Sequence, residues 1–122
     1  MPYITPSKEQ FYALKNSGYV GPIVMINLQK FKDADSAIRY ERYAAFTIRL
    51  IKEELGGRLI YKGKYLMPFI GEGDWDSVLI VEYPSIEAFL KMQRNEAYLK
   101  ALPDRQESLA DSRVFFTVGE AP

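Results

Sequence analysis

The stretch "GDWDSVLIVEYPSIEAFLKM", residues 73–92, decides the fold. Residues 76–83 predict a β-strand, and their central residues 78–81 are apolar at every position, so both faces of the strand are apolar. Residues 85–95 predict a helix, because apolar side chains recur at helical spacing and Ser85 can cap the start. Glu82 interrupts the apolar strand. A carboxylate in such a place needs a cation or a hydrogen-bond donor as a partner. The stretch therefore predicts a strand followed by a helix and marks Glu82 as a residue to explain.

The other segments predict a ferredoxin-like order of elements. A clear helical period runs from residue 35 to residue 57, and β-branched and aromatic residues predict three further strands, at 22–31, 58–71 and 113–118. The order is β-α-β-β-α-β. It is typical of the α+β class, with a four-stranded antiparallel sheet and two helices on one face.

Local signals predict where the helices begin and end. Asp35 or Ser36 is expected to cap the long helix, and Pro103 to stop a short turn that Asn95 begins. Asp104 and Glu107 have the spacing of a capping box. In the strand at 58–71, Gly63 suggests a bulge and Pro68 an edge or a bend.

The length of 122 residues predicts one domain over 1–122, with residues 1–20 as an N-terminal helical extension that Thr5 caps. Sixteen basic and sixteen acidic residues balance, so the charge gives no reason to expect nucleic acid or an anionic membrane as a partner. The absence of apolar runs of about 18 residues, and of an apolar leader at the start, predicts a soluble cytoplasmic protein.

The chain has no cysteine and no histidine. These absences exclude disulfides, thiolate metal sites, a cysteine nucleophile and a histidine base. No phosphate-binding loop or metal-ligand spacing is present either. We therefore expect no metal and no cofactor.

Both faces of the predicted sheet are apolar. In the first strand Val24, Ile26 and Leu28 point one way and Ile23 and Met25 the other. Two helices can cover only one face, and an exposed apolar sheet is a liability for a monomer. We expect a homodimer in which two sheets pack face to face. The alternative is that the first helix or the C-terminal tail covers the second face of a monomer.

Six sequence segments carry a family resemblance: "VMINLQKF", "YERYAAF", "GGRLIYKG", "DWDSVLIVEYPSIEAFLKM", "NEAYL" and "LADSR". Over residues 22–118 the chain resembles the domain of unknown function 1330 family of the dimeric α/β-barrel superfamily. The resemblance implies a ferredoxin-like protomer whose sheet closes into a barrel with a second copy. It implies no activity, because one fold hosts many functions.

Glu82 and Asn27 are the candidate catalytic residues. A buried Glu82 with a raised pKa could act as a base or an acid, and a structural ion pair is the alternative; its possible partners are Arg58, Lys62, Arg105 and Arg113. Asn27, among apolar neighbours, could bind a substrate carbonyl or support an oxyanion. It could equally satisfy a backbone group or Glu82.

The candidate substrate-binding residues are Tyr43, Trp75, Asp76 and Arg105. Tyr43 or its neighbour Tyr40 could point a hydroxyl into a pocket, or could simply pack in the core. Trp75 could wall a pocket or seal a dimer seam. Asp76 could contact a ligand or cap a strand, and Arg105 could hold an anion or pair with a surface acid.

Together these residues suggest a small-molecule site between the sheet and its helices. Cofactor-free proton transfer there, with Glu82 as base, could support isomerisation or oxygenation of an electron-rich substrate. The alternative is a non-catalytic binding or assembly module. A cavity of roughly 300 Å³ or more with converging polar groups would favour a small-molecule site.

Overall fold

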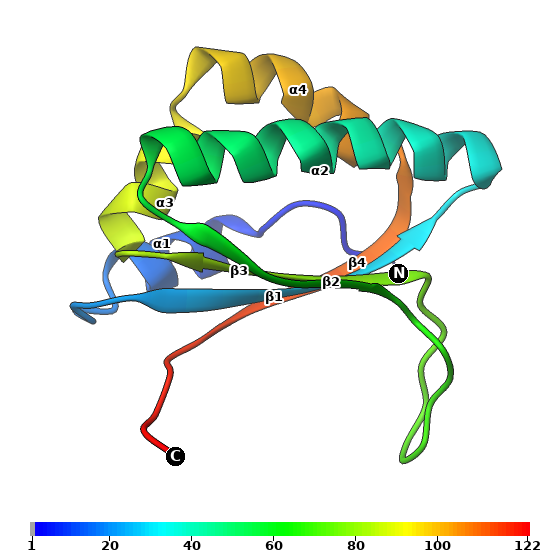
Figure 1. Ribbon diagram of the computed structural model, residues 1–122, viewed down its shortest axis with the longest axis horizontal. Helices are drawn as coiled ribbons and strands as arrows, with labels where there is room; N and C mark the ends of the chain where they lie inside the picture. Colours follow the sequence, from blue (N-terminus) through cyan, green and yellow to red (C-terminus); the bar gives the residue numbers. More distant parts are fainter. Residues whose placement is uncertain (1) are drawn as a thin grey trace.

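The structure, a computed structural model, describes residues 2–122 and shows the predicted β-α-β-β-α-β order with two additions: the expected helix before the first strand, and a second helix before the last strand, where a short turn was expected. The elements are α1 (Lys8–Lys15), β1 (Ile23–Phe31), α2 (Ala34–Glu54), β2 (Arg58–Lys64), β3 (Ser77–Tyr83), α3 (Ile86–Gln93), α4 (Glu96–Gln106) and β4 (Leu109–Thr117). All strand pairs are antiparallel, in the order β2-β3-β1-β4, and the helices α2, α3 and α4 cover one face of the sheet (Figure 1).

The two central strands, β1 and β3, alternate strictly between the two faces. Ile23 pairs with Tyr83 and Asn27 with Leu79, and all four side chains are buried under the helices. The residues between them point to the other face. This alternation follows from the two-residue period of a strand.

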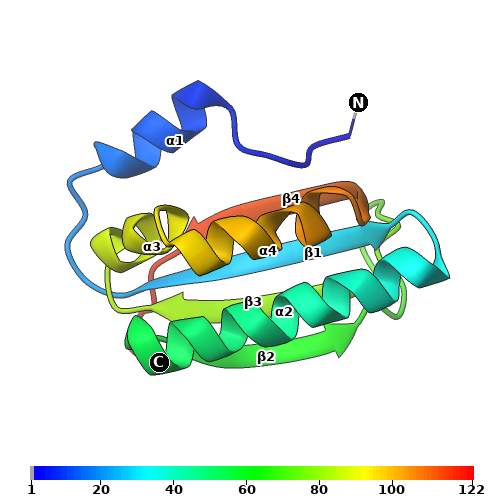
Figure 2. The ribbon, with the colours of Figure 1, turned by 90° about the horizontal axis from the view of Figure 1, so that it is seen from above.

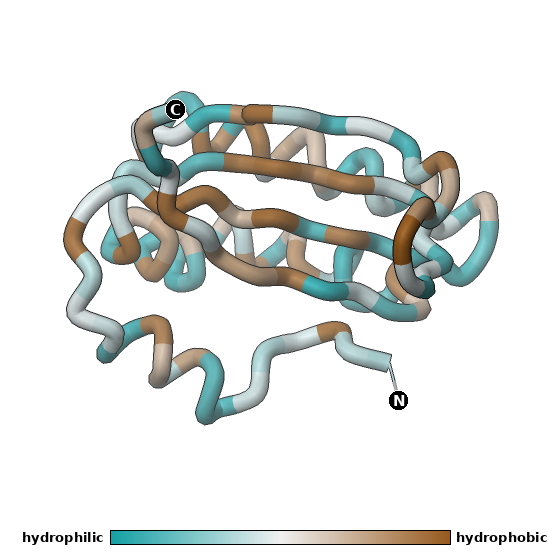
Figure 3. The backbone as a smooth tube through the Cα atoms, turned by 90° about the horizontal axis from the view of Figure 1, so that it is seen from below, coloured by the Kyte–Doolittle hydropathy of each residue, from teal (hydrophilic) through white to brown (hydrophobic). Residues whose placement is uncertain are grey.

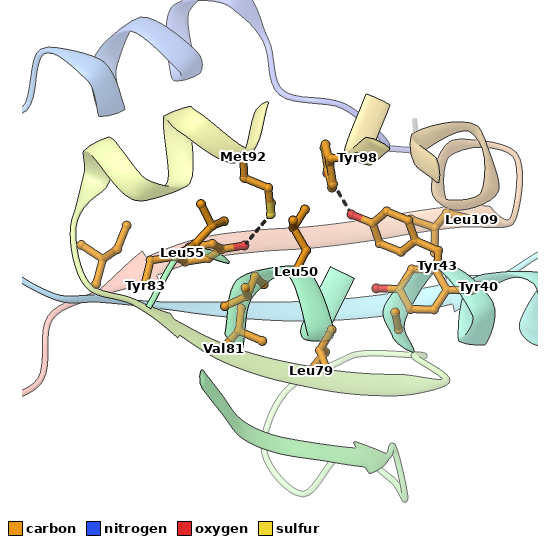
Figure 4. Close-up of a cluster of buried hydrophobic side chains, with 13 residues drawn as sticks. Tyr40, Tyr43, Leu50, Leu55, Leu79, Val81, Tyr83, Met92, Tyr98 and Leu109 are labelled. Atoms are coloured by element: carbon orange, nitrogen blue, oxygen red, sulfur yellow. Dashed lines mark hydrogen bonds between the residues drawn. The ribbon is translucent and has the colours of Figure 1, made fainter. Parts of the chain in front are cut away.

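The core lies between the sheet and α2 (Figure 4). The long helix buries a stripe of residues at three- and four-residue spacing, as an amphipathic helix must. These residues are Tyr40, Tyr43, Ala44, Thr47, Leu50 and Ile51.

Several predicted helix boundaries differ from the structure. The side chain of Asp33, and not that of Asp35 or Ser36, caps α2, because its carboxylate accepts a hydrogen bond from the Ser36 amide at 2.7 Å. Ser7 caps α1 in a reciprocal pair with Gln10, so the prediction of Thr5 as the cap is wrong. Both true caps lie two or three residues from the predicted ones.

The end of α4 was also predicted wrongly. Pro103 lies inside the helix, which runs on to Gln106, and β4 begins at Leu109. Asp104 and Glu107 form no capping box. They bind Arg39 of α2 instead, at 2.6 and 3.0 Å. These ion pairs attach the last turn of α4 to α2.

Strand β2 is shorter than the predicted 58–71, and its irregularity lies between Leu59 and Tyr61 instead of at Gly63. Residues 65–76 form a long connection to β3. It projects from the side of the sheet opposite to the helices, as does the C-terminal tail (Figure 1). Leu66, Phe69 and Ile70 of this connection are almost fully exposed.

Residues 2–122 leave the second face of the sheet uncovered. The central strands are hydrophobic along most of their length (Figure 3), and Val24, Ile26, Val78 and Ile80 on this face are only half-buried. Helix α1 contacts α3 and lies to the side of the sheet, beyond β4, and not beneath its second face (Figure 2). The alternative in which the first helix covers this face is therefore wrong. The C-terminal tail leaves the sheet at one end and does not lie across this face either (Figure 1).

Among residues 2–122, no helix combines the length and the apolar composition that crossing a membrane requires.

Candidate ligand-binding cavity

A cavity of about 680 Å³ lies between the sheet and the helices. Its floor is the helix-facing side of β1, β3 and β4, its roof is α2, α3 and α4, and residues 3–14 form one side wall. The floor includes Met25, Asn27, Val81, Val114 and Phe116. Most of the lining is apolar, so the cavity favours a mainly apolar molecule.

Tyr43 and Tyr98 bring two hydroxyls together in the roof. Tyr43 comes from α2 and Tyr98 from α4, and their oxygens are 2.9 Å apart (Figure 4). Burial raises the pKa of Tyr43 well above its ordinary value. The hydroxyl therefore stays protonated at neutral pH and acts in hydrogen bonds rather than as a base.

Tyr40 lies next to this pair and also lines the cavity. Its hydroxyl accepts a hydrogen bond from Gln29 Nε2 at 2.8 Å. Burial is the main cause that raises the pKa of Tyr40 to about 12, while the charge of Arg105 acts in the opposite direction. The sequence left open whether Tyr40 and Tyr43 pack in the core or point a hydroxyl into a pocket. In the structure their rings pack in the core, and both residues also line the cavity.

Two lining oxygens lack a hydrogen-bond donor among the described residues. Thr47 Oγ1 is buried without any partner, and the whole residue is only 6% exposed. Asn27 donates through Nδ2 to the Leu79 carbonyl at 2.9 Å, while no donor in residues 2–122 reaches its Oδ1. Of the two, Thr47 Oγ1 is the fully buried one, and a buried oxygen without a partner costs free energy. A ligand carrying a hydroxyl or an amide could offset that cost.

Two arginines reach the cavity from α4 and β4. Arg105 is half-buried and donates from Nη1 to the Ile4 carbonyl at 2.5 Å. Arg113 bonds to Asp111 Oδ1 at 2.7 Å and stacks on the rings of Tyr3 and Trp75. Both contacts with Tyr3 and Ile4 attach the N-terminal segment to the cavity rim.

The structure brings together three of the six predicted site residues: Asn27, Tyr43 and Arg105 all line the cavity. Glu82 does not. It pairs with Val24 across the strands and faces the uncovered side of the sheet, where Arg58 Nε meets its carboxylate at 3.0 Å. The expectation that Glu82 lines a pocket under the helices is therefore wrong. The alternative of a structural ion pair fits, with Arg58 as the partner.

Trp75 and Asp76 lie in the connection before β3, outside the cavity lining. The Asp76 carboxylate accepts a hydrogen bond from the Phe31 amide at 2.7 Å, and the Asp76 amide donates to the Gln29 carbonyl. These bonds fit the alternative in which Asp76 caps a strand. Trp75 contacts the cavity only through Arg113, whose guanidinium lies 5.2 Å from its ring.

Sequence reasoning missed Thr47, Tyr98 and the N-terminal segment as parts of the site. Thr47 lies four residues after Tyr43, so helical spacing could have placed it on the same face. Tyr98 carries no such signal, because only the packing of α4 on α2 brings it to Tyr43. In the described part of the chain, no three or more acidic side chains gather in a way that could hold a metal ion.

The antiparallel sheet with helices on one face, and a cavity between the two layers, defines an α+β protein of ferredoxin-like fold. The chain belongs to the family described as a domain of unknown function (DUF1330), which matches residues 24–118. No curated protein matches it significantly.

Solved structures agree with this fold. RPA0582 from Rhodopseudomonas palustris, described as a protein of unknown function, is 31% identical over 100% of both chains, with a TM-score of 0.89. A dimeric ferredoxin-like protein of unknown function from Thermobifida fusca is 17% identical, over 80% of this chain and 91% of the other, at a TM-score of 0.59.

A more distant neighbour has a described activity. SnoaB, a cofactor-independent oxygenase from Streptomyces nogalater, is 14% identical over 83% of this chain and 95% of its own, at a TM-score of 0.56. At this identity the likeness shows the fold alone.

Proposed function

We propose that the protein binds a small, mainly apolar organic molecule in the cavity between the sheet and the helices. The observation that carries this proposal is the cavity itself, about 680 Å³ in volume, with the buried Thr47 Oγ1 unpartnered in its lining. Pockets for small ligands have this size and this mixture of apolar walls and a few polar groups.

Binding is better supported than acid–base catalysis. The cavity lining contains no aspartate, glutamate, histidine or cysteine, and the raised pKa of Tyr43 keeps its hydroxyl neutral. The proposed base, Glu82, lies on the other face of the sheet. A cofactor-independent oxygenase such as SnoaB shares the fold, yet 14% identity carries no catalytic residue over to this chain.

We further propose that two copies pair through the uncovered sheet face. The apolar side chains of Val24, Ile26, Val78 and Ile80 support this, because their burial would remove apolar surface from water. The exposed apolar residues of the connection 65–76 project on the same side and could reach a partner. A fold neighbour described as dimeric agrees with such pairing.

Fluorescence titration with the neutral probe N-phenyl-1-naphthylamine tests ligand binding. We expect saturable binding of one probe per chain. Val114 lines the cavity from β4, so Val114→Phe should fill part of the space and weaken binding about tenfold. Ile38→Phe is the matched control, since Ile38 is exposed on α2 outside the lining, and it should leave the affinity unchanged. Absence of saturable binding, or equal affinities for wild type and Val114→Phe, would reject the proposal.

A further inference from the structure

The charged side chains that line the cavity are all positive. The chain as a whole is neutral, with sixteen basic and sixteen acidic residues, yet the lining holds two arginines and no acidic residue. Charges act more strongly in a cavity partly shielded from water than on an open surface. The lining therefore favours a ligand that carries negative charge.

The two arginines are not equally available. Arg113 is paired with Asp111 and stacked on two aromatic rings. Arg105 has no carboxylate partner among residues 2–122, because the nearby Asp104 and Glu107 both form ion pairs with Arg39. Within residues 2–122, the guanidinium of Arg105 makes one hydrogen bond, in which one of its five N–H groups donates to the Ile4 carbonyl.

Arg105 shares the cavity lining with Tyr40, Tyr43 and Tyr98. Its charge acts on the hydroxyls of Tyr40 and Tyr43 and opposes the rise of their pKa values that burial causes. A half-buried cation without an anion pays a desolvation cost that a carboxylate can offset. One planar guanidinium matches one carboxylate with two parallel hydrogen bonds.

The rest of the cavity suits an apolar body. Phe89 and Phe116 meet edge to face at a ring distance of 5.1 Å, and Met92 and Leu102 also line the space. Such walls accept a flat aromatic ring or a short alkyl chain. Among residues 2–122, the only other cation in the lining is Arg113, which is already paired with Asp111, so a doubly charged group such as a phosphate monoester is less well matched.

We propose that the ligand of this cavity is an organic monocarboxylate with an aromatic or alkyl body, whose acid group binds Arg105. This inference rests on the proposed binding function and names its ligand class. The body lies between the apolar walls near Phe89 and Phe116, with Thr47 and Asn27 free to accept hydrogen bonds from polar substituents.

A matched pair of probes tests the proposal. 1-Naphthylacetate and 1-naphthylacetamide share one apolar body and differ in charge, and each can be titrated as a competitor of bound N-phenyl-1-naphthylamine. Wild type should prefer the acid over the amide about tenfold. Arg105→Gln should abolish that preference while the affinities for the amide and the neutral probe change less than about twofold. Arg105→Lys should restore part of it.

Arg94→Gln is the matched control, because Arg94 lies at the end of α3 outside the cavity lining and pairs only with Glu87. It should keep the full preference for the acid. Equal affinities for the acid and the amide in wild type, or an equal loss of both in Arg105→Gln, would overturn the inference while leaving the binding function standing. Failure of the neutral probe itself to bind would instead remove the binding function.

Discussion

Three buried tyrosines make stability depend on pH above neutrality. Tyr40, Tyr43 and Tyr83 are almost fully buried, and burial is the first cause that raises the pKa of each. The folded protein holds these protons more tightly than the unfolded chain does. Their contribution to stability is therefore complete below pH 10 and is lost as the pH rises toward the folded pKa values.

Tyr40 allows the size of this effect to be predicted. Its pKa rises from 10.0 to about 12 on folding, so its contribution falls by roughly 3 kcal/mol between these pH values. Urea unfolding at several pH values from 9 to 12 should show a shallower loss of stability in Tyr40→Phe than in wild type. Tyr12→Phe, at an exposed position on α1, should keep the wild-type slope. Identical slopes for Tyr40→Phe and wild type would contradict the prediction.

At the scale of single residues, three of the six site residues proposed from the sequence, Asn27, Tyr43 and Arg105, line one cavity. Their roles in binding stay predictions. Glu82 was misplaced for a physical reason: alternation shows that it shares a face with Val78 and Ile80, but both faces of the strand are apolar. Nothing in the sequence therefore shows which face meets the helices.

At the scale of elements, one glycine governs the junction of α2 and β2. A Cβ on Gly57 would lie 2.3 Å from the Glu82 carbonyl oxygen and 2.5 Å from Ile51 Cγ2. The first of these atoms belongs to the backbone of β3 and the second to the buried side of α2, so neither can move away cheaply. The helix can return to the sheet this closely only because residue 57 has no side chain.

Gly57→Ala should therefore lower the free energy of unfolding by about 2–3 kcal/mol. Gly119→Ala is the matched control, because its Cβ would meet no atom within 4 Å, and it should change stability by less than about 0.5 kcal/mol. Chemical unfolding of both variants under one buffer condition gives the comparison. A Gly57→Ala protein as stable as the control would show that the junction relaxes more easily than its packing suggests.

Element order was predictable from the sequence, and some boundaries were not. Alternation and helical spacing are local signals, and they gave all four strands and the long helix. The extension of α4 past Pro103 depends instead on Arg39, which lies 65 residues away from Asp104 and holds the last turn. A contact of that range leaves no mark in the local pattern, so the proline and the capping-box spacing predict an earlier end of the helix than the structure shows.

At the scale of the whole molecule, the uncovered apolar face of the sheet is the surface through which we expect two copies to pair. Its central residues Ile26 and Ile80 lie opposite each other on β1 and β3, with Phe115 beside Ile26 on β4. Specific dimers bury about 1,200–2,000 Å² in total. A four-stranded sheet with the connection 65–76 projecting from one end offers a broad apolar surface for this, and it leaves the cavity on the other face free for a ligand.

Ile26→Lys tests the dimer, because it places a charge at the centre of that surface. Sedimentation velocity at low micromolar concentration should give a dimer for wild type and a folded monomer for Ile26→Lys, since an unpaired charge cannot be buried between two sheets without a large cost. Ile38→Lys, on the exposed side of α2, should remain dimeric. The monomeric variant should still bind the neutral probe, because Ile26 points away from the cavity. A wild type that sediments as a folded monomer would remove the dimer, and the cavity would then stand as a property of one chain alone.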